Sequence, residues 1–491
     1  MKNENMDSAD FGSPYDTDLL SMVSQVERFC KYGLTFRLEC LIKSCECNEI
    51  FEKGVPAVRY KLSRYNNLFT RGNSTYLWNT LSEALLHIDE DSLRFIHAFD
   101  GADHSGEDAF DILLKNRCIV SSELNECNQV LKEEKISILN PFQKVLHLTI
   151  APGLGCNYHC VYCFEKHREQ KNAMTESTCE ELVRFIKNTA DANPALKYVM
   201  IRWFGGEPLL YMDTISFISD QLIPYFQSAN ITYYSEIITN GRFLTVENAK
   251  RLRDYGIARV QLPIDGMPDY YMAQKKATRD DFEHTIKNII DSCDILPIQV
   301  RINISDEKEE ALRLTEYLLR DLNLDGKIKI GIAHIRNYDM ADSAEEEALH
   351  REFLEFEKQY IHEFVNNGKY SPESLALTPP MRRPANCYCI CSNNFVIGPG
   401  GELYRCEHHL GRKEYSVGNI SDGENYSPIE MHFIHYRHPE KCLFCSIFPV
   451  CLSGCLNYRL SMACREYKEH LFDLLLFSYR SGIIQKQSAR L

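Results

Sequence analysis

A loop with three cysteines constrains this chain more than any other feature of its sequence. The loop follows an apolar, strand-like segment, and its cysteines have the spacing C-x-x-x-C-x-x-C, at Cys156, Cys160 and Cys163. Iron–sulfur clusters normally take four thiolate ligands, so three thiolates leave one iron of a [4Fe-4S] cubane open. A structural zinc site would need a fourth Cys or His, and the nearby His159 and His167 do not stand at a spacing typical of zinc sites. The loop therefore predicts a cluster that binds and reduces a small molecule.

A second motif, Gly205-Gly206-Glu207-Pro208, ends the next strand-like segment. Paired glycines let the backbone approach a ligand closely, and a carboxylate can accept hydrogen bonds from an ammonium group. Alone, Gly205-Gly206 would also suit an ordinary strand-to-helix turn. Together with the cysteine loop, the motif resembles the radical S-adenosylmethionine (SAM) enzymes, which place a Gly-Gly-Glu-Pro motif at the methionine amino group of SAM.

Composition and charge exclude several other classes. The 491 residues are 44% hydrophobic and 25% charged, close to the average of soluble globular chains, and no apolar run is long enough to span a bilayer. The first residues are polar and acidic, unlike a secretory signal, so we expect a cytoplasmic protein without a membrane span. The net charge of −14 disfavours nucleic acid as a partner. In a reducing cytoplasm, 20 cysteines indicate metal ligation in place of disulfides.

Between residues 146 and 333, apolar segments alternate with amphipathic ones, which is the pattern of a parallel sheet covered by helices. The predicted strands are Leu146–Ile150, Tyr198–Trp203, Tyr234–Ile238, Arg259–Pro263, Ile298–Asn303 and Lys327–Ala333. The predicted helices are Glu176–Thr189, Met212–Gln227, Val246–Tyr255, Arg279–Asp291 and Glu307–Asp321. Right-handed crossovers would curl these units into a partial (β/α)6 barrel of the TIM type, an α/β fold that the resemblance also implies. The motifs follow the carboxyl ends of the strands, where barrel active sites lie.

The radical SAM resemblance also implies roles for single residues. It makes the three loop cysteines the ligands of the SAM-binding cluster, places Tyr162 beside adenine, and gives the methionine ammonium to Glu207 after Gly205 and Gly206. It suggests contacts with SAM or substrate for three residues on later strands or at their ends, namely Asn240, Asp265 and Arg301. Asn240-Gly241 and Asp265-Gly266 are equally good turn dipeptides, and Arg301 could simply pair with a barrel carboxylate. No catalytic side chain is assigned.

A second cysteine array occupies the C-terminal third of the chain. It comprises Cys387, Cys389, Cys391, Cys406, Cys442, Cys445, Cys451, Cys455 and Cys464. Its order resembles the SPASM domain, which carries two auxiliary [4Fe-4S] clusters in radical SAM enzymes that modify peptides and proteins. The resemblance implies one cluster on Cys442, Cys445, Cys451 and Cys464. The other would use Cys406, Cys455 and upstream cysteines, of which we favour Cys387 and Cys391. A three-ligand auxiliary cluster and a pair of zinc ribbons are the alternatives.

Residues 57–140 are expected to form a small separate module. Strand-like segments at Val58–Ser63 and Thr75–Asn79, with a turn at Thr70–Asn73, precede helical segments and an apolar end at Arg117–Val120. This order resembles the precursor-peptide recognition element, a winged-helix module that binds a leader peptide as an added edge strand. A simple N-terminal cap is the alternative. The expected domain order is a partly disordered extension (1–56), this module (57–140), the radical SAM partial barrel (141–340), a helical bridge (341–380), and a SPASM domain with a C-terminal helix (381–491).

Taken together, the resemblances imply a maturase of ribosomally made peptides. Its cofactors would be SAM and three [4Fe-4S] clusters, its substrate a precursor peptide bound through the leader, and its reductant a ferredoxin or flavodoxin. A 5′-deoxyadenosyl radical would abstract hydrogen from the peptide, and an intramolecular thioether or carbon–carbon crosslink would form. An anaerobic sulfatase maturase, which makes formylglycine from Cys or Ser, is the alternative enzyme, and it needs no leader-binding module. A non-catalytic scaffold would not need the intact cysteine loop.

Overall fold

The computed structural model describes residues 59–140, 142–166, 172–305, 307–336, 343–365, 369–425, 435–456 and 463–483. All of them belong to one structural unit, Arg59–Leu491. The expectation of partial disorder in residues 1–56 lies outside the described residues. None of the described helices is both long and apolar enough to cross a membrane.

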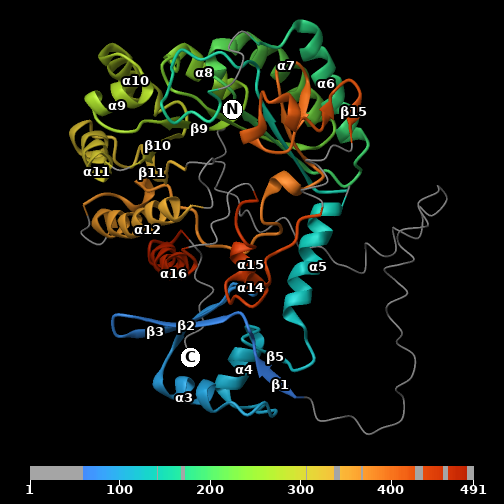
Figure 1. The fold of residues 1–491 in the computed structure, drawn as a ribbon, viewed down its shortest axis with the longest axis vertical. Helices are drawn as coiled ribbons and strands as arrows, with labels where there is room; N and C mark the ends of the chain where they lie inside the picture. Colours follow the sequence, from blue (N-terminus) through green and yellow to red (C-terminus); the bar gives the residue numbers. More distant parts are fainter. Residues whose placement is uncertain are drawn as a thin grey trace, which may run out of the picture. The chain divides into compact units, whose positions relative to one another are not determined.

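A ten-stranded sheet organises most of the chain (Figure 1). Its strand order is β11-β10-β9-β8-β7-β6-β12-β13-β14-β15. The six strands β6 to β11 are parallel neighbours in sequence order, as right-handed βαβ units produce. Their bounds are β6 Val145–Ile150, β7 Tyr198–Trp203, β8 Thr232–Ile238, β9 Ile257–Pro263, β10 Ile298–Ile304 and β11 Ile328–His334. Each predicted strand overlaps one of these six, and the predicted partial α/β barrel is confirmed.

Amphipathic helices connect these strands and cover the sheet (Figure 1). They are α6 Glu176–Asp191, α7 Met212–Ser228, α8 Val246–Asp254, α9 Pro268–Lys275, α10 Arg279–Ser292 and α11 Lys308–Glu316, which continues as the π-helix Tyr317–Asp321. Threonines cap α6, α8 and α10 by accepting a hydrogen bond from the backbone of the first turn. Helix α9 was not predicted, although Pro268 at its first position is a typical helix start.

The C-terminal third extends the barrel sheet. Strand β12 (Asn394–Ile397) pairs in parallel with β6, with Asn394 opposite His147. Three short strands follow at this edge, β13 (Glu402–Tyr404), β14 (Gly418–Asn419) and β15 (Gly423–Glu424). Helices α12 (Ala344–Val365) and α16 (Cys464–Arg480) lie side by side (Figure 1). The short helices α14 (Glu440–Leu443) and α15 (Phe448–Cys451) carry part of the cysteine array.

The N-terminal module consists of two small sheets and three helices. Strands β1 (Tyr60–Leu62) and β5 (Ile119–Ser121) form one sheet, and β2 (Asn66–Arg71), β3 (Ser74–Asn79) and β4 (Leu85–Ile88) form the other. The helices are α3 (Glu90–Ala98), α4 (Asp108–Lys115) and α5 (Glu126–Leu139). The turn predicted at Thr70–Asn73 is the hairpin between β2 and β3. Strand β4 was missed because its four residues are too few to show a clear alternation.

Aromatic and polar contacts fix this module to the C-terminal third. The Phe69 ring on β2 stacks on Phe472 of α16 with centroids 4.4 Å apart, and Arg71 Nε donates to Asp473 Oδ1 at 2.6 Å. Thr80 Oγ1 donates to the carbonyl of Ser446 at 2.7 Å. Because Ser446 follows Cys445 directly, the module lies beside the second cysteine array.

Candidate active site at the carboxyl ends of the barrel strands

The cysteine loop begins directly after β6 and leans on helix α9. The Val161 N–H donates to the Gln274 carbonyl at 2.9 Å, and the His159 N–H donates to the Lys275 carbonyl at 3.2 Å. These two hydrogen bonds flank Cys160. Carbonyls at the end of a helix lack partners within the helix, and here the loop supplies them. The unpredicted helix α9 therefore holds the loop in place.

The glycine motif lies against the same loop. The Glu207 N–H donates to the Gly155 carbonyl at 2.8 Å, and the Gly206 N–H donates to the Gly153 carbonyl at 3.2 Å. A Cβ atom on Gly206 would stand 2.0 Å from the Gly155 oxygen, and one on Gly205, whose φ is +105°, would stand 2.6 Å from the Gly153 oxygen. The glycines are thus required by the close approach of the cysteine loop itself.

The carboxylate of Glu207 is completely buried and bound by protein groups. Its Oε1 accepts from the Thr239 hydroxyl at 2.6 Å and from the Leu209 N–H at 3.0 Å, while Oε2 accepts from the Asn240 N–H at 2.7 Å. Burial raises the pKa of Glu207 to about 7, although these hydrogen bonds act in the opposite direction. In this arrangement the carboxylate joins the ends of β7 and β8, and its assignment to the methionine ammonium stays a prediction.

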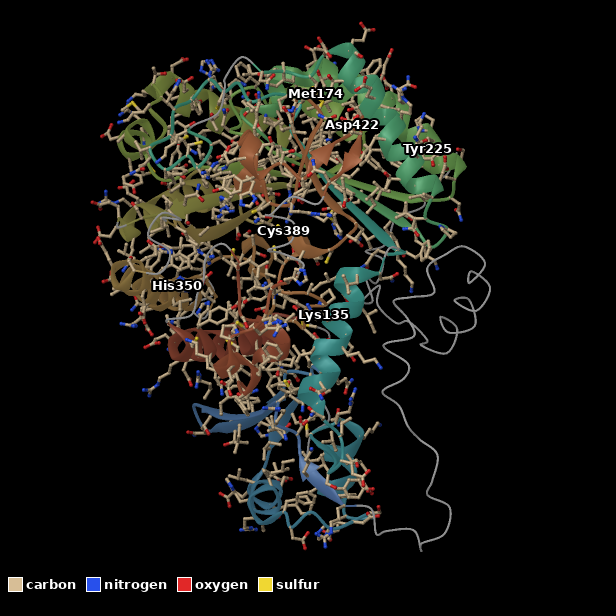
Figure 2. The ribbon with its side chains drawn as sticks, turned by 45° about the vertical axis from the view of Figure 1, so that its right-hand side comes forward. Lys135, Met174, Tyr225, His350, Cys389 and Asp422 are labelled. Carbon is tan, nitrogen blue, oxygen red and sulfur yellow. The ribbon has the colours of Figure 1, made fainter. Side chains whose placement is uncertain are left out.

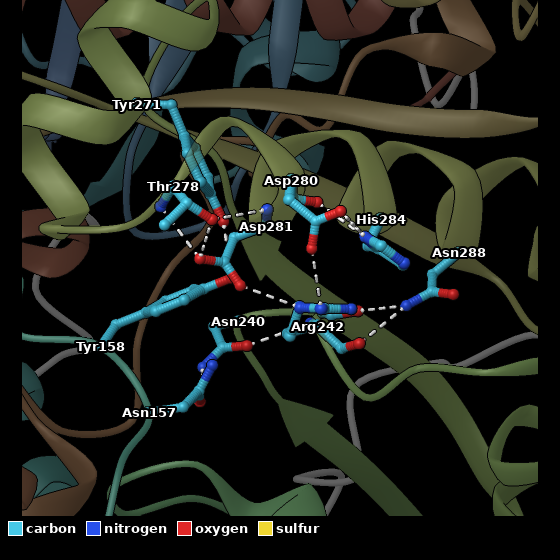
Figure 3. Close-up of polar contacts among 11 residues, drawn as sticks. Asn157, Tyr158, Asn240, Arg242, Tyr271, Thr278, Asp280, Asp281, His284 and Asn288 are labelled. Atoms are coloured by element: carbon cyan, nitrogen blue, oxygen red, sulfur yellow. Dashed lines mark hydrogen bonds and ion pairs between the residues drawn. The ribbon is translucent and has the colours of Figure 1, made fainter.

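Asn240 connects the end of β8 to the cysteine loop. Its Nδ2 donates to Asn157 Oδ1 at 2.7 Å and lies 3.9 Å from the Cys156 sulfur (Figure 3). Its Oδ1 accepts from the Arg242 N–H at 3.0 Å, and the Arg242 side chain is bound by Asp281 at 2.9 Å (Figure 3). The Asn240 side chain therefore links the turn after β8 to the first cysteine of the loop. The interpretation of Asn240-Gly241 as a turn did not include this contact.

Tyr162 and Asp265 meet in a buried polar network. The Tyr162 hydroxyl donates to Asp265 Oδ2 at 2.6 Å and accepts from Lys275 Nζ at 2.8 Å, while Asn303 Nδ2 donates to Asp265 Oδ1 at 3.0 Å. Burial alone would lower the pKa of Lys275, but Asp265, Tyr162 and Cys160 raise it above its usual value. Lys275 was missed by the sequence reasoning because it lies on the unpredicted helix α9.

None of the contacts described above involves Arg301. It is an exposed residue within β10, and its positive charge acts on His408 of the C-terminal third. A different network was also missed: the Glu236 carboxylate on β8 binds Arg202 at 2.6 Å and Arg259 at 2.9 Å. Arg202 in turn donates to Glu407 at 2.6 Å. Since Glu407 follows Cys406, this network ties the second cysteine array to the barrel.

Four cysteines of the C-terminal array gather on α14, on the turn between α14 and α15, on α15 and at the start of α16. Burial raises the pKa of Cys451 to about 12, and the neighbouring thiols of Cys445, Cys442 and Cys464 raise it as well. These four are the residues predicted to hold one auxiliary cluster. The backbone supports them locally, since the Cys445 N–H donates to the Cys442 carbonyl at 3.0 Å.

The upstream cysteines Cys387, Cys389 and Cys391 interact with one another. A hydrogen bond from Cys389 lowers the pKa of the Cys387 thiol. Cys389, which Figure 2 labels, is also hydrogen-bonded to the thiol of Cys406. Burial raises the pKa of Cys391 to about 12. The structure therefore places Cys389, which we did not favour, between Cys387 and Cys406. The ligand set of this cluster stays a proposal.

These donor sets fit iron–sulfur clusters. None of the cysteines within the described ranges forms a disulfide, and soft thiolates suit Fe–S clusters. In the part of the chain that the structure describes, no three His, Cys, Asp or Glu side chains lie close enough to share a single metal ion. A cubane makes a different demand, because each thiolate binds its own iron. The Cys156 loop would hold the SAM-binding cluster, with the glycine motif and Asn240 beside it.

Comparison with known proteins supports this interpretation of the site. Residues 150–314 match the family model of the Radical SAM superfamily. The GTP 3',8-cyclase of Campylobacter jejuni subsp. doylei is 30% identical over 165 residues, which make up 33% of this chain and 47% of that protein, so the chain spans less than half of its length. The cysteine-type anaerobic sulfatase-maturating enzyme of Clostridium novyi is 26% identical over 351 residues, 64% of this chain and 88% of that protein.

A solved structure has the same fold. Native anSMEcpe with bound AdoMet and Cp18Cys peptide superimposes with a TM-score of 0.54 at 19% identity, covering 69% of this chain and 98% of that chain. The superfamily match covers both motifs whose geometry is described above, the cysteine loop and the glycine turn that supports it. Residues 150–314 of the chain therefore form a radical SAM domain.

Proposed function

We propose that this chain is a peptide maturase that forms an intramolecular thioether or carbon–carbon crosslink in a ribosomally made precursor peptide. One observation carries the proposal: a small module, whose strand β4 is a sheet edge within the described residues, is fixed beside the C-terminal cysteine array. A sulfatase maturase modifies a whole protein and has no need of such a module. About three tenths of this chain lies outside the alignment with anSMEcpe, which covers 69% of it.

The chain's own residues would divide the work in the following way. The Cys156 loop holds the SAM-binding cluster, and the turn after Gly206 and the side chain of Asn240 support that loop. The cluster, when bound and reduced, supplies an electron that cleaves SAM to methionine and a 5′-deoxyadenosyl radical. The strand ends surround this position and aim the radical at the peptide. The cysteines on α14 to α16, and those around Cys389, would hold the two auxiliary clusters.

The crosslinking reaction removes two hydrogens from the peptide, so it needs an electron acceptor. A peptide carbon would give up one hydrogen atom to the 5′-deoxyadenosyl radical, and the second group would give up a proton and one electron, for which an auxiliary cluster would be the acceptor. A bond then forms between the two peptide atoms, and the peptide is lighter by two hydrogens. A ferredoxin or flavodoxin would reduce the SAM-binding cluster and take electrons back from the auxiliary ones.

The free edge of β4 is where a leader strand would add. In an antiparallel pair, hydrogen-bonded and non-hydrogen-bonded residue pairs alternate. The Asn79 N–H donates to the Ala84 carbonyl, so Leu85 and His87 fall in non-hydrogen-bonded positions opposite β3. Their backbone groups face away from β3. Within the described residues, β4 pairs with no other strand, so a peptide could bind there by β-augmentation.

The proposal is tested by mass spectrometry of the precursor peptide encoded beside this gene, after anaerobic incubation with reconstituted enzyme, SAM and dithionite. We expect loss of two hydrogens per crosslink. Alkylation then distinguishes the products, because a thioether consumes a cysteine thiol and a carbon–carbon bond does not. Release of 5′-deoxyadenosine with an unchanged peptide mass would contradict crosslinking of that peptide.

The leader site has its own matched pair of variants. His87→Pro removes an outward N–H from an edge strand, a position that tolerates proline, and His87→Ala removes only the side chain. We expect His87→Pro to weaken binding of a labelled leader peptide roughly fivefold, since a lost hydrogen bond is worth about 1 kcal/mol. His87→Ala should bind much as the parent does. Equal binding by both variants and the parent would exclude β4 as the leader site.

Formylglycine formation is the second candidate, favoured by the similarity to the Clostridium novyi enzyme over 88% of its length. Incubation with a cysteine-containing sulfatase peptide distinguishes the two functions. Conversion of its cysteine to an aldehyde, detected with a hydrazine probe, without any need for a leader, would favour formylglycine formation over crosslinking.

A further inference from the structure

Helix α9 brings a buried positive charge to the cysteine loop. Lys275 is the last residue of α9, and only 1% of its surface is exposed. Its Nζ lies 2.8 Å from the Tyr162 hydroxyl and 3.3 Å from Asp265 Oδ2. The helix ends there because Lys276 adopts a left-handed conformation with φ of +53°. Lysine is almost never fully buried without a partner, so its presence here calls for a reason.

Hydrogen bonds attach Lys275 and its helix to the cysteine loop. Its carbonyl and that of Gln274 accept the N–H groups on both sides of Cys160. On the same helix, the Tyr271 hydroxyl donates to the Tyr158 hydroxyl at 3.3 Å, and the rings meet edge to face (Figure 3). The ammonium is therefore held between the Tyr162 hydroxyl and Asp265, and its charge acts on the Cys160 thiol.

A purely structural role does not require this ion pair. Replacing a buried ion pair by apolar residues of similar volume is often neutral or stabilising, because desolvation of two charges offsets their attraction. Backbone hydrogen bonds and the Tyr271–Tyr158 contact already attach α9 to the loop. What an apolar residue could not supply is a positive charge that acts on the thiol of Cys160.

We propose that Lys275 sets the reduction potential of the cluster held by the Cys156–Cys163 loop, with Asp265 as the opposing charge that positions the ammonium. Reduction adds one electron to a cluster that three thiolates already make negative. Net charge near a cluster is one of the determinants of its potential, and buried charges are screened little. The ammonium therefore favours the reduced state. The inference rests on the superfamily's cluster and not on the crosslinking reaction.

The test is an EPR-monitored redox titration of the reconstituted holoenzyme with dithionite, following the cluster signal that changes when SAM is added. Lys275→Met should lower the midpoint potential by at least 59 mV, which corresponds to a tenfold change in the equilibrium constant of a one-electron couple. Asp265→Asn should shift it in the opposite direction, because the ammonium loses its counter-charge. Lys275→Arg, which keeps the charge, should restore most of the difference. The matched control is Lys276→Met, which removes the same charge from an exposed neighbour.

The sign of the shifts separates this role from a structural one. Damage to the loop would move both Lys275→Met and Asp265→Asn in one direction, and that result would overturn the proposal. So would a Lys275→Met shift no larger than that of Lys276→Met. If Lys275→Met fails to take up the cluster, Asp265→Asn must raise the midpoint and Lys275→Arg must leave it near the parent's value, or the proposal is wrong. The titration uses no peptide, so its outcome is independent of whether crosslinking is confirmed.

Discussion

Replacing Gly206 by alanine should displace the cysteine loop. The new Cβ would stand 2.0 Å from the Gly155 oxygen, whereas ordinary contact begins at 3.4 Å, so the two backbones must separate by 3.4 − 2.0 = 1.4 Å. The neighbouring atoms are backbone carbonyls and cannot rotate away. Such overpacking costs about 1–3 kcal/mol. Separation of the two backbones also breaks the 2.8 Å hydrogen bond from the Glu207 N–H to the Gly155 carbonyl. A buried polar group left without its partner costs about another 1–3 kcal/mol.

The total of about 2–6 kcal/mol is a large part of the free energy of unfolding of a typical domain. We expect Gly206→Ala to melt at a lower temperature in a thermal scan and to lose the EPR signal of the SAM-binding cluster, because Cys156 follows Gly155 directly. The control is Gly326→Ala, where a Cβ meets nothing within 4 Å and only left-handed strain of about 1–2 kcal/mol is added. A Gly206→Ala protein that melts and binds iron like the Gly326→Ala control would refute the reasoning.

Three further predictions concern the barrel interior, the clusters and pH. Glu236→Gln leaves two guanidinium groups without their shared carboxylate, and the free energy of unfolding in urea should fall by about 2–4 kcal/mol, discounted for the partial exposure of the arginines; a change below about 0.5 kcal/mol would contradict it. Cys451→Ser should lower the iron content by about four atoms per chain, the content of one [4Fe-4S] cluster; an unchanged content would remove Cys451 from the ligands. Burial lowers the pKa of His350 to about 3 and of His334 to about 4. Below pH 6.5 the unfolded chain then binds protons that the folded chain does not, so stability falls by about 1.4 kcal/mol per pH unit per histidine. His350→Phe should reduce that slope between pH 6.5 and pH 5, and a slope equal to the parent's would contradict the cause.

The barrel could be predicted from the sequence because each unit is local. A buried parallel strand shows as a continuous apolar run, and its helix shows as an amphipathic period, so β7 was predicted at its observed bounds, Tyr198–Trp203. The two motifs were also readable, because each is a contiguous run of residues.

What could not be predicted depends on contacts between distant segments. Lys275 looks like any surface lysine until α9 brings it to Tyr162, 113 residues away along the chain. Glu407 reaches Arg202 across 205 residues, and nothing in the pattern around either residue indicates that they meet. The position of Cys389 between Cys387 and Cys406 likewise follows from the short helix Tyr388–Ile390, which spacing alone does not reveal.

The parallel pairing of β12 with β6 has a consequence for how the chain folds during synthesis. The strand that precedes the cysteine loop keeps one side unpaired until the ribosome has made Asn394, which lies opposite His147. Pairings between such distant residues form slowly, and a waiting strand edge is prone to associate with other chains. The first barrel strand is therefore exposed to aggregation until β12 has been made. A truncated gene product ending before β12 should be recovered from cells mainly in the insoluble fraction.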